Sequence, residues 1–171
     1  MQISDRKAIK RGMVIAGVLW LGLAGEILIS NVVLPSKTDG DAISVGVSYL
    51  CVFAALFLTG TLAARDGAGR KGRILAGLLA GSMIGALTVA TFVVVDNVWL
   101  DIVAQQSAKI DGFAHSNAGS MREYINHELV GPAVFLTVGL GILGAALSWA
   151  GGLIGRLSRS GQLSIGGRRS C

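Results

Sequence analysis

The chain has 171 residues, of which 52% are hydrophobic and only 15% are charged, and its mean hydropathy is +0.65. Soluble domains usually carry about 25% charged residues, so this composition leaves too little charge to cover a water-soluble surface. The net charge of +5 is divided into short clusters between apolar runs, which indicates membrane topology rather than nucleic-acid binding. The composition therefore predicts an integral membrane protein.

Four apolar runs are long enough to cross a bilayer, because a helix needs about 20 residues to span a hydrocarbon core of ~30 Å. They carry no charged residue except Glu26 in the first, and they cover residues 12–34, 43–64, 74–95 and 129–154. Inside lipid every backbone polar group needs an internal partner, so each run is expected to be helical. The predicted fold is an all-α membrane protein: a four-transmembrane-helix bundle over residues 1–155.

Lysine and arginine residues predict the orientation, because cytoplasmic loops are enriched in them. The N-terminal segment, the loop between the second and third spans, and the C-terminal tail hold four each: Arg6, Lys7, Lys10 and Arg11; Arg65, Arg70, Lys71 and Arg73; Arg156, Arg159, Arg168 and Arg169. The opposite side holds only Lys37, Lys109 and Arg122. We therefore expect a multi-pass protein of the cell membrane with both termini in the cytoplasm.

The two ends of the chain carry further signals. A basic segment, an apolar stretch and small residues at Gly22 and Ala24 loosely resemble a cleavable signal peptide. The apolar run continues to Leu34, which is longer than usual for such a peptide and favours a retained span. Residues 156–171 are rich in Ser, Gly and Arg and are predicted to form a disordered, basic cytoplasmic tail.

The connection between the third and fourth spans, residues 96–128, is the long one. From Val95 to Phe113 apolar residues recur at steps of three and four, which predicts an amphipathic helix. We expect a helical segment on the outer face of the membrane. Two roles stay open for it: a cap that lies over the bundle, and a binding surface for an external partner.

Two further features of this region concern helix ends and metal ligands. Ser120 and Glu123 have the spacing of a capping box, and Gly131–Pro132 predicts a kink or a new helix start because Pro132 cannot donate a backbone hydrogen bond. Glu123 and His127 stand four residues apart on one helical face, but the pattern is not HExxH. No metal site is predicted.

Small residues form stripes along the third and fourth spans. The predicted helix-packing residues are Gly77, Gly81, Gly85, Gly141, Ala145, Ser148, Gly152 and Gly155. Small side chains let helix backbones approach closely in a membrane. The stripes are therefore expected to be packing faces, either for each other within one bundle or for a second copy of the chain.

Glu26 is the charged residue inside a predicted span, and such a residue marks a functional hypothesis because burying it in lipid is costly. It lies eight residues before Leu34, which is about 12 Å along a helix at 1.5 Å per residue. Counting to the same depth in the other spans predicts an intramembrane polar layer of Glu26, Tyr49, Thr88, Thr91 and Thr137. This layer is either a proton- or cation-coupled site or a structural hydrogen-bond network that fixes helix packing.

No motif in the sequence indicates an enzyme, since GxSxG, HExxH, P-loop and redox-cysteine patterns are missing, and no catalytic residue or cofactor is predicted. The main functional prediction is a non-enzymatic assembly, scaffold or regulatory subunit that packs through its small-residue faces. Its expected partners are the lipid bilayer and a second copy of the chain or another membrane protein, with no nucleic acid.

The alternative is a small proton- or cation-coupled transporter or channel that uses Glu26. In its four spans and the single membrane glutamate in the first span, the chain resembles the small multidrug resistance transporters. It departs from that family in its long outer segment, in its strong charge bias between the two sides and in the lack of the family's wider motifs. The resemblance lies at the level of architecture, which many functions can share.

Overall fold

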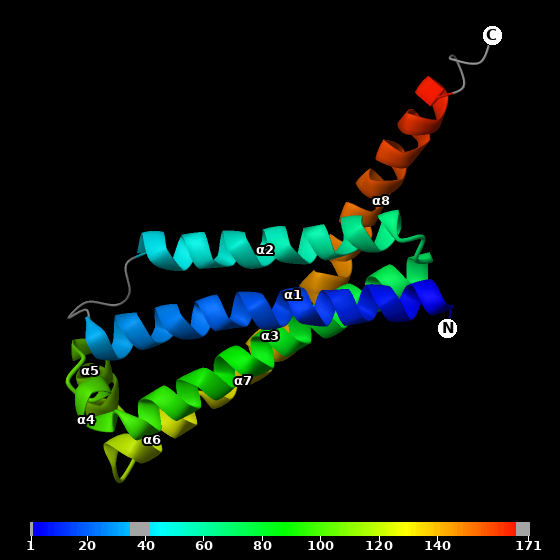
Figure 1. The fold of residues 1–171 in the computed structure, drawn as a ribbon. Helices are drawn as coiled ribbons and strands as arrows, with labels where there is room; N and C mark the ends of the chain where they lie inside the picture. Colours follow the sequence, from blue (N-terminus) through cyan, green and yellow to red (C-terminus); the bar gives the residue numbers. More distant parts are fainter. Residues whose placement is uncertain (1, 35–41, 167–171) are drawn as a thin grey trace.

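The computed structural model describes residues 2–34 and 42–166, and all regular structure in these ranges is helical. The first half contains α1 (Ile3–Leu28), the π-helix η1 (Ile29–Val33), α2 (Ala42–Arg65) and α3 (Arg70–Val98) (Figure 1). The second half contains α4 (Leu100–Val103), α5 (Ser107–Ala114), α6 (Met121–Glu128), α7 (Val130–Val134), the π-helix η2 (Phe135–Gly139) and α8 (Leu140–Gly166).

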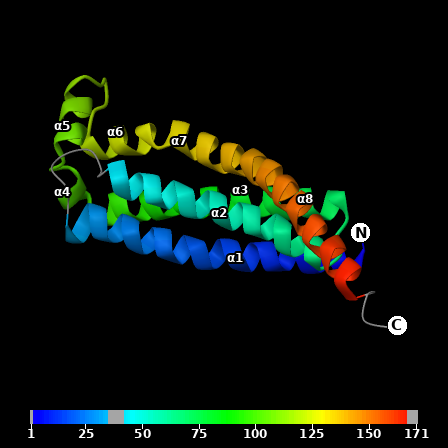
Figure 2. The ribbon, with the colours of Figure 1, turned by 90° about the horizontal axis from the view of Figure 1, so that it is seen from above.

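Within the described residues, four segments are long and apolar enough to cross a membrane, as the sequence predicts. They are Ile3–Val33, Val45–Arg65, Arg70–Val98 and Met121–Gly155. The last of these, which runs from α6 into α8, is the fourth long segment of the bundle. The four segments lie side by side (Figures 1 and 2).

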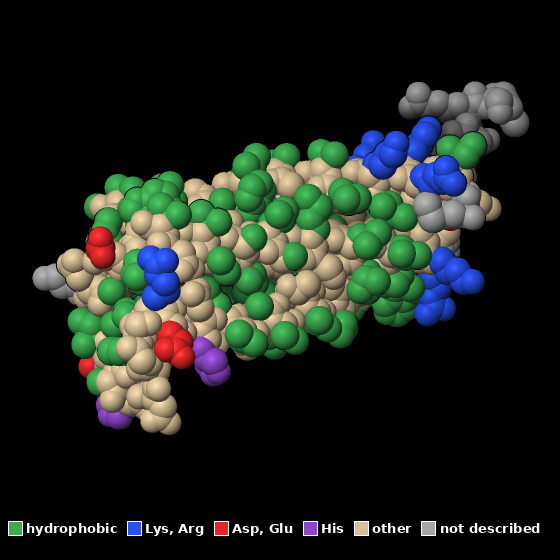
Figure 3. Space-filling model, turned by 90° about the horizontal axis from the view of Figure 1, so that it is seen from below, with side chains coloured by type: hydrophobic (Ala, Val, Ile, Leu, Met, Phe, Trp, Pro, Cys, Tyr) green, Lys and Arg blue, Asp and Glu red, His purple; other side chains and the backbone are tan. Residues whose placement is uncertain are grey.

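The two ends of the bundle differ. The N-terminus and the turn between α2 and α3 lie at one end, the N-terminal end, and the helices α4, α5 and α6 lie at the other, the capped end (Figure 1). On the face seen in Figure 3, most Lys and Arg side chains gather at the N-terminal end, Asp, Glu and His side chains lie at the capped end, and hydrophobic side chains cover the middle.

Helix α3 and the fourth segment are in close contact along several turns, and glycines make this contact possible. A Cβ atom added to Gly77, Gly81 or Gly85 would come within 3.0 Å of the backbone of Gly144, Leu140 or Leu136, respectively. No side chain fits between backbones at that separation. The glycine stripe of the third span is therefore occupied within the chain.

The predicted stripe on the fourth segment also faces its own bundle. Gly141 lies against Ser82, the Ser148 hydroxyl donates to the carbonyl of Arg73 at 2.8 Å, and Gly155 lies against Thr61 of α2. Ala145 is half-buried. The sequence analysis missed three glycines that are buried at the same contacts: Gly60, Gly144 and Gly151.

The sequence suggested that Arg73 is a loop residue, but the structure places it in a helix. It lies in the first turn of α3 and is 1% exposed, and its Nε donates to the carbonyl of Gly69 at 3.4 Å. Gly152 leaves room for the guanidinium group, because a Cβ atom there would overlap Arg73.

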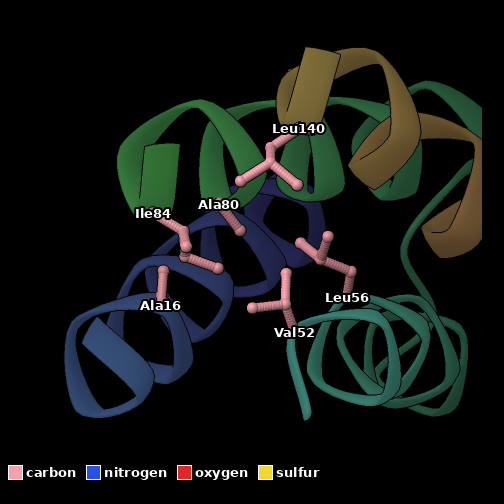
Figure 4. Close-up of a cluster of buried hydrophobic side chains, with 6 residues drawn as sticks. All are labelled: Ala16, Val52, Leu56, Ala80, Ile84 and Leu140. Carbon is pink, nitrogen blue, oxygen red and sulfur yellow. The ribbon is translucent and has the colours of Figure 1, made fainter. Parts of the chain in front are cut away.

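A hydrophobic cluster holds the centre of the bundle (Figure 4). All four long segments contribute to it, with the buried residues Ala16, Val52, Leu56, Ala80, Ile84 and Leu140. Small alanines on α1 and α3 share this cluster with larger aliphatic side chains of α2, α3 and α8, which fills the space between helices that cross at close range. The core therefore joins α1 and α2 to the tight pair of α3 and α8.

Helix α2 leaves the fourth segment toward the capped end. The two run parallel, because Phe57 lies against Gly151 and Thr61 against Gly155. Among the described residues, α2 packs extensively on α8 but makes at most marginal contact with η2 or α7. Figures 1 and 2 both show α2 and α7 separating in this direction. The bundle is thus closed at the N-terminal end and spread at the capped end.

Two long segments contain a π-helical turn in the spread half. In η1 the Leu34 amide donates to the Ile29 carbonyl five residues back, at 2.8 Å. In the fourth segment α6 ends at Glu128 and a new helix starts at Val130, which confirms the break predicted from Gly131–Pro132. Pro132 has no amide hydrogen to continue the regular pattern, and the wider turn of η2 follows three residues later.

The connection between the third and fourth spans corrects one prediction. A single amphipathic helix from Val95 to Phe113 was expected, but α3 continues to Val98 and the rest is divided into α4 and α5. The chain turns at Trp99 and again at residues 104–106, which folds the segment back over the bundle end. The predicted N-cap is present, because the Glu123 amide donates to Ser120 Oγ at 3.2 Å. The capping box is not complete: the Glu123 carboxylate accepts from the amide of Gly119, at 2.9 Å, and not from that of Ser120.

The tail also differs from its prediction. Helix α8 continues through residues 156–166, where a disordered tail was expected, because adding a residue to an existing helix is far easier than starting one. Residues 167–171, and residues 35–41 between the first two spans, lie outside the described residues.

The backbone contacts predict a sharp difference between two glycine-to-alanine variants. Gly81→Ala should lower the free energy of unfolding by about 1–3 kcal/mol, because its methyl group meets the Leu140 backbone. Gly22→Ala has open space and should change it by less than about 1 kcal/mol, in the stabilising direction. Reversible unfolding in mixed micelles measures both. Equal effects would show that α3 and the fourth segment are not in backbone contact.

Candidate functional site

A cavity of about 340 Å³ lies in the spread half of the bundle, where all four long segments and the α4–α5 linker border it. Its floor is made by Val52, Ile84 and Leu140, which belong to the central cluster (Figure 4). Most of its remaining wall is apolar, with Leu23, Ile27, Val45, Phe92 and Leu136. Small-molecule sites are typically apolar hollows of about 300–1,000 Å³ with a few polar groups, and this cavity fits the lower end of that range.

Glu26 is the charged group on the wall among the described residues. Its carboxylate accepts a hydrogen bond from the Ser48 hydroxyl of α2. Glu26 stands two residues before Leu28, the last residue of α1, and η1 begins at the next residue, Ile29. This bond joins α1 and α2 in the half of the bundle where α2 has left the fourth segment.

The π-helical turn fixes the backbone around Glu26. The Ser30 hydroxyl donates to the carbonyl of Glu26 at 2.9 Å, and Asn31 Nδ2 donates to the carbonyl of Ile27 at 2.9 Å. These side chains add hydrogen bonds to backbone carbonyls in the last turn of α1. Ser30 and Asn31 also line the cavity, so the same turn that positions Glu26 adds polar groups to the site.

Thr88 brings a hydrogen-bonding group that is not satisfied by the described residues. Its Oγ1 atom is inaccessible to solvent and has no hydrogen-bond partner among them, and Thr88 lines the cavity. A buried hydroxyl without a partner costs free energy. Among the described residues, Thr88 therefore carries a buried hydroxyl that no hydrogen bond stabilises.

A roof formed by the end of the α4–α5 linker and the start of α5 covers the cavity at the capped end. Gln106, Ser107 and Ala108 line it, and Gln106 Nε2 donates to Asn31 Oδ1 of η1 at 3.3 Å. The roof is held from the other side as well, because Lys109 forms an ion pair with Glu128 of α6 at 2.6 Å.

A polar contact joins α3 to α6, the helix whose Glu128 pairs with Lys109. Asn97 Nδ2 donates to Asn126 Oδ1 at 2.8 Å, which ties α6 to the end of α3. Asp96 is 3% exposed beside them, and Lys109 and Glu128 are its charged neighbours. The edge-to-face pair of Phe113 and Tyr124, with centroids 6.1 Å apart, joins α5 to α6.

The structure brings together three residues of the predicted polar layer and separates two. Glu26, Tyr49 and Thr88 line the cavity. Thr91 faces α1 instead, where Trp20 Nε1 donates to its Oγ1 at 3.0 Å. Thr137 is not among the described lining residues, and its backbone lies against Gly85.

Sequence reasoning missed several polar lining residues for an identifiable reason. Ser48 lies at the predicted depth, next to Tyr49, but depth alone did not show that it faces Glu26. Asn31 is a polar residue near the end of an apolar run and could have been found. Gln106 reaches the cavity only because the chain folds back after Val98, which local periodicity does not predict.

Comparison with protein-family models, with curated proteins and with solved structures finds no match to this chain. The chemistry of the site is therefore read from its residues. Among the described residues, no three His, Cys, Asp or Glu side chains are grouped so that they could hold a metal ion. The described part of the chain lines the cavity with one carboxylate, several hydroxyl and amide groups, and apolar side chains.

Two threonine-to-valine variants should have opposite effects. Thr88→Val removes a buried hydroxyl without a described partner and should raise the free energy of unfolding by up to about 1 kcal/mol. Thr91→Val removes a hydroxyl that accepts from Trp20 and donates to the Leu87 carbonyl, and should lower it by about 1 kcal/mol. Unfolding in micelles without added ligand measures both. A loss of stability in Thr88→Val would mean that this hydroxyl has a partner.

Proposed function

We propose that the chain is a multi-pass protein of the cell membrane that binds small organic cations in the cavity beside Glu26 and transports them. The observation that carries this proposal is a carboxylate on the wall of a mostly apolar cavity inside the bundle. An amine or quaternary ammonium group would meet Glu26, and the organic part of the ligand would contact the apolar walls. No Lys or Arg lines the cavity among the described residues.

The charge distribution supports an orientation with both termini in the cytoplasm. Lys and Arg side chains gather at the N-terminal end (Figure 3), as positive-inside topology requires. Arg11 pairs with Asp66 there at 2.6 Å, and the guanidinium of Arg70 stands 5.8 Å from the ring centre of Trp149. Such pairing of basic and aromatic side chains is typical of a membrane–water interface.

The same orientation would make the segment between α3 and α7 an amphipathic cap on the outer face. Val103 and Ile125 are fully buried beneath it, whereas Asp101, Asp111 and Arg122 are exposed. The apolar side of the segment therefore packs on its own bundle, and this favours the cap over a docking surface for an external partner.

The packing weakens the case for the assembly role. That role was predicted from small-residue faces, and these faces contact each other within the chain at Gly77, Gly81 and Gly85. A second copy is not needed to explain them. The cavity, by contrast, does not stabilise the bundle, since empty space inside a bundle is destabilising. A filled core would serve the fold better.

Single-cysteine labelling tests the orientation. In a background with Cys51 and Cys171 replaced by Ser, Asn117→Cys at the capped end should react with a membrane-impermeant maleimide in intact cells. Lys71→Cys at the N-terminal end should react only after the membrane is opened. Both residues are exposed, so accessibility to water alone decides the result. The reverse pattern would overturn the orientation.

Binding of phenethylamine tests the site. The wild-type protein in nanodiscs should bind the protonated amine and not the neutral alcohol of the same shape, 2-phenylethanol. Glu26→Gln should lose about tenfold or more in affinity, because a hydrogen bond to a charged group is worth about 1.5–3 kcal/mol. It should also abolish uptake of the amine into proteoliposomes.

Asp101→Asn is the matched control, because it removes the same charge from an exposed residue outside the cavity. It should leave binding and uptake unchanged. If Glu26→Gln bound phenethylamine as tightly as the wild type and this control, the cation site would be refuted.

A further inference from the structure

We propose that a hollow between the starts of α1 and α3, at the N-terminal end of the bundle, binds the head group of an anionic phospholipid. The phosphate lies at Arg70 and Lys71, and an acyl chain follows exposed leucines of α3 into the membrane. This surface lies at the opposite end of the bundle from the roof and does not involve Glu26, so the inference goes beyond the proposed function.

The hollow has a volume of about 540 Å³ and lies where two helices begin at the same end of the bundle (Figure 1). The start of α1 and the start of α3 line it, with Gln2 and Asp5 from the first and Gly69, Arg70, Lys71, Gly72 and Leu75 from the second. Basic pockets between transmembrane helices on the cytoplasmic side bind anionic head groups. In the proposed orientation, this end faces the anionic cytoplasmic leaflet.

The carboxylate that lines the hollow is held by backbone amides. Asp5 Oδ1 accepts from the amide of Gly69 at 3.1 Å, and Asp5 Oδ2 accepts from the amide of Gln2 at 3.1 Å. Gly72 leaves room for this contact, because a Cβ atom there would overlap the carboxylate. Asp5 therefore joins the starts of α1 and α3, and the two glycines that flank the basic pair serve this contact.

The two basic residues of the hollow have no acidic partner among the described residues. Neither Arg70 nor Lys71 takes part in a salt bridge there, although Arg11 at the same end is paired with Asp66. Both side chains are exposed, and the Arg70 guanidinium stands 5.8 Å from the ring centre of Trp149. An aromatic ring attracts a cation but does not neutralise it. A phosphate group would supply the negative charge that the described residues do not.

An apolar strip of α3 leads from the hollow into the membrane. Leu75 stands one turn after Lys71 on the same face and lines the hollow, and Leu79 follows one turn later. These leucines are 41% and 40% exposed, so in a bilayer lipid tails cover them. A ligand that contacts both Lys71 and this strip needs a phosphate joined to an alkyl chain. That description fits a phospholipid and not a free phosphate ion.

Phosphatidylglycerol and phosphatidylcholine with the same acyl chains separate the charge of the head group from the tail. Native mass spectrometry measures which lipid the protein retains when it is released from nanodiscs that contain both in equal mole fraction. The wild type should prefer phosphatidylglycerol at least tenfold. Lys71→Gln should lower this preference about fivefold, which corresponds to about 1 kcal/mol for one basic residue, and Lys71→Arg should restore it.

Lys10→Gln is the matched control, because it removes the same charge from an exposed residue of α1 that does not line the hollow. It should change the lipid preference by less than twofold. Equal effects of Lys71→Gln and Lys10→Gln would overturn the inference, because the preference would then come from the net charge of this end and not from the hollow.

Photolabelling locates the lipid on the unmodified protein. Phosphatidylglycerol with a diazirine in the middle of one acyl chain should label residues 75–79 of α3 more strongly than phosphatidylcholine with the same group. Equal labelling of these residues by the two probes would contradict an anionic site at this place.

Glycerol 3-phosphate distinguishes a lipid from a free phosphate. A large molar excess of it should not displace phosphatidylglycerol from the wild type, because it lacks the chain that contacts Leu75 and Leu79. Displacement would show that the hollow takes a soluble phosphate, and the lipid assignment would be wrong. The cation site is tested separately, since Lys71→Gln should bind phenethylamine like the wild type and Glu26→Gln should keep the lipid preference.

Discussion

The backbone contact between α3 and the fourth segment governs the rest of the bundle. At Gly77, Gly81 and Gly85 the backbones of the two helices are too close for any intervening side chain. Dispersion between closely approaching backbones is an important source of helix association where no water is available to drive it. Because this pair is fixed, α1 and α2 must arrange themselves around it, and each finds its own small-residue contact: Gly12 against Ala76, and Gly60 against Ser148.

The cavity follows from where those contacts stop. Toward the capped end α2 has no glycine contact with the fourth segment, and the fourth segment changes course at Pro132 and η2. The space this leaves is floored by Leu140 and Ile84 and bordered by Glu26. The closely packed half at the N-terminal end stabilises the bundle. The spread half at the capped end can therefore hold polar side chains that helix packing alone would not favour. A rigid framework around a few polar side chains is the arrangement that binding sites need.

Much of the fold could be predicted from the sequence, because it depends on composition and local pattern. The four apolar runs, the cap at Ser120 and the break at Pro132 are local signals, and all are present. Glu26 also stood out, since a carboxylate in an apolar run is rare at any rotation of the helix. The glycine stripes indicated packing faces, but periodicity could not say which helix would meet them.

What the sequence could not predict depends on rotation and on distant contacts. Thr88 and Thr91 lie within a turn of each other, yet one lines the cavity and the other accepts a hydrogen bond from Trp20. Gln106 enters the site only through the fold of the whole connection, and Ser48 only through the rotation of α2. Arg73 counted as a loop charge in the sequence but is buried, because Gly152 of a distant helix leaves space for it.

The central claim, a bundle closed at one end and spread at the other, is tested most directly by distances between spin labels on α2 and the fourth segment in nanodiscs. One pair at Leu58 and Leu153 reports the N-terminal half, and one at Val47 and Val138 reports the capped half; all four side chains are exposed. Pulsed electron–electron double resonance should give a clearly longer separation between the labels of the second pair than between those of the first. Equal separations would mean that α2 follows the fourth segment along its whole length, and that the cavity beside Glu26 does not exist.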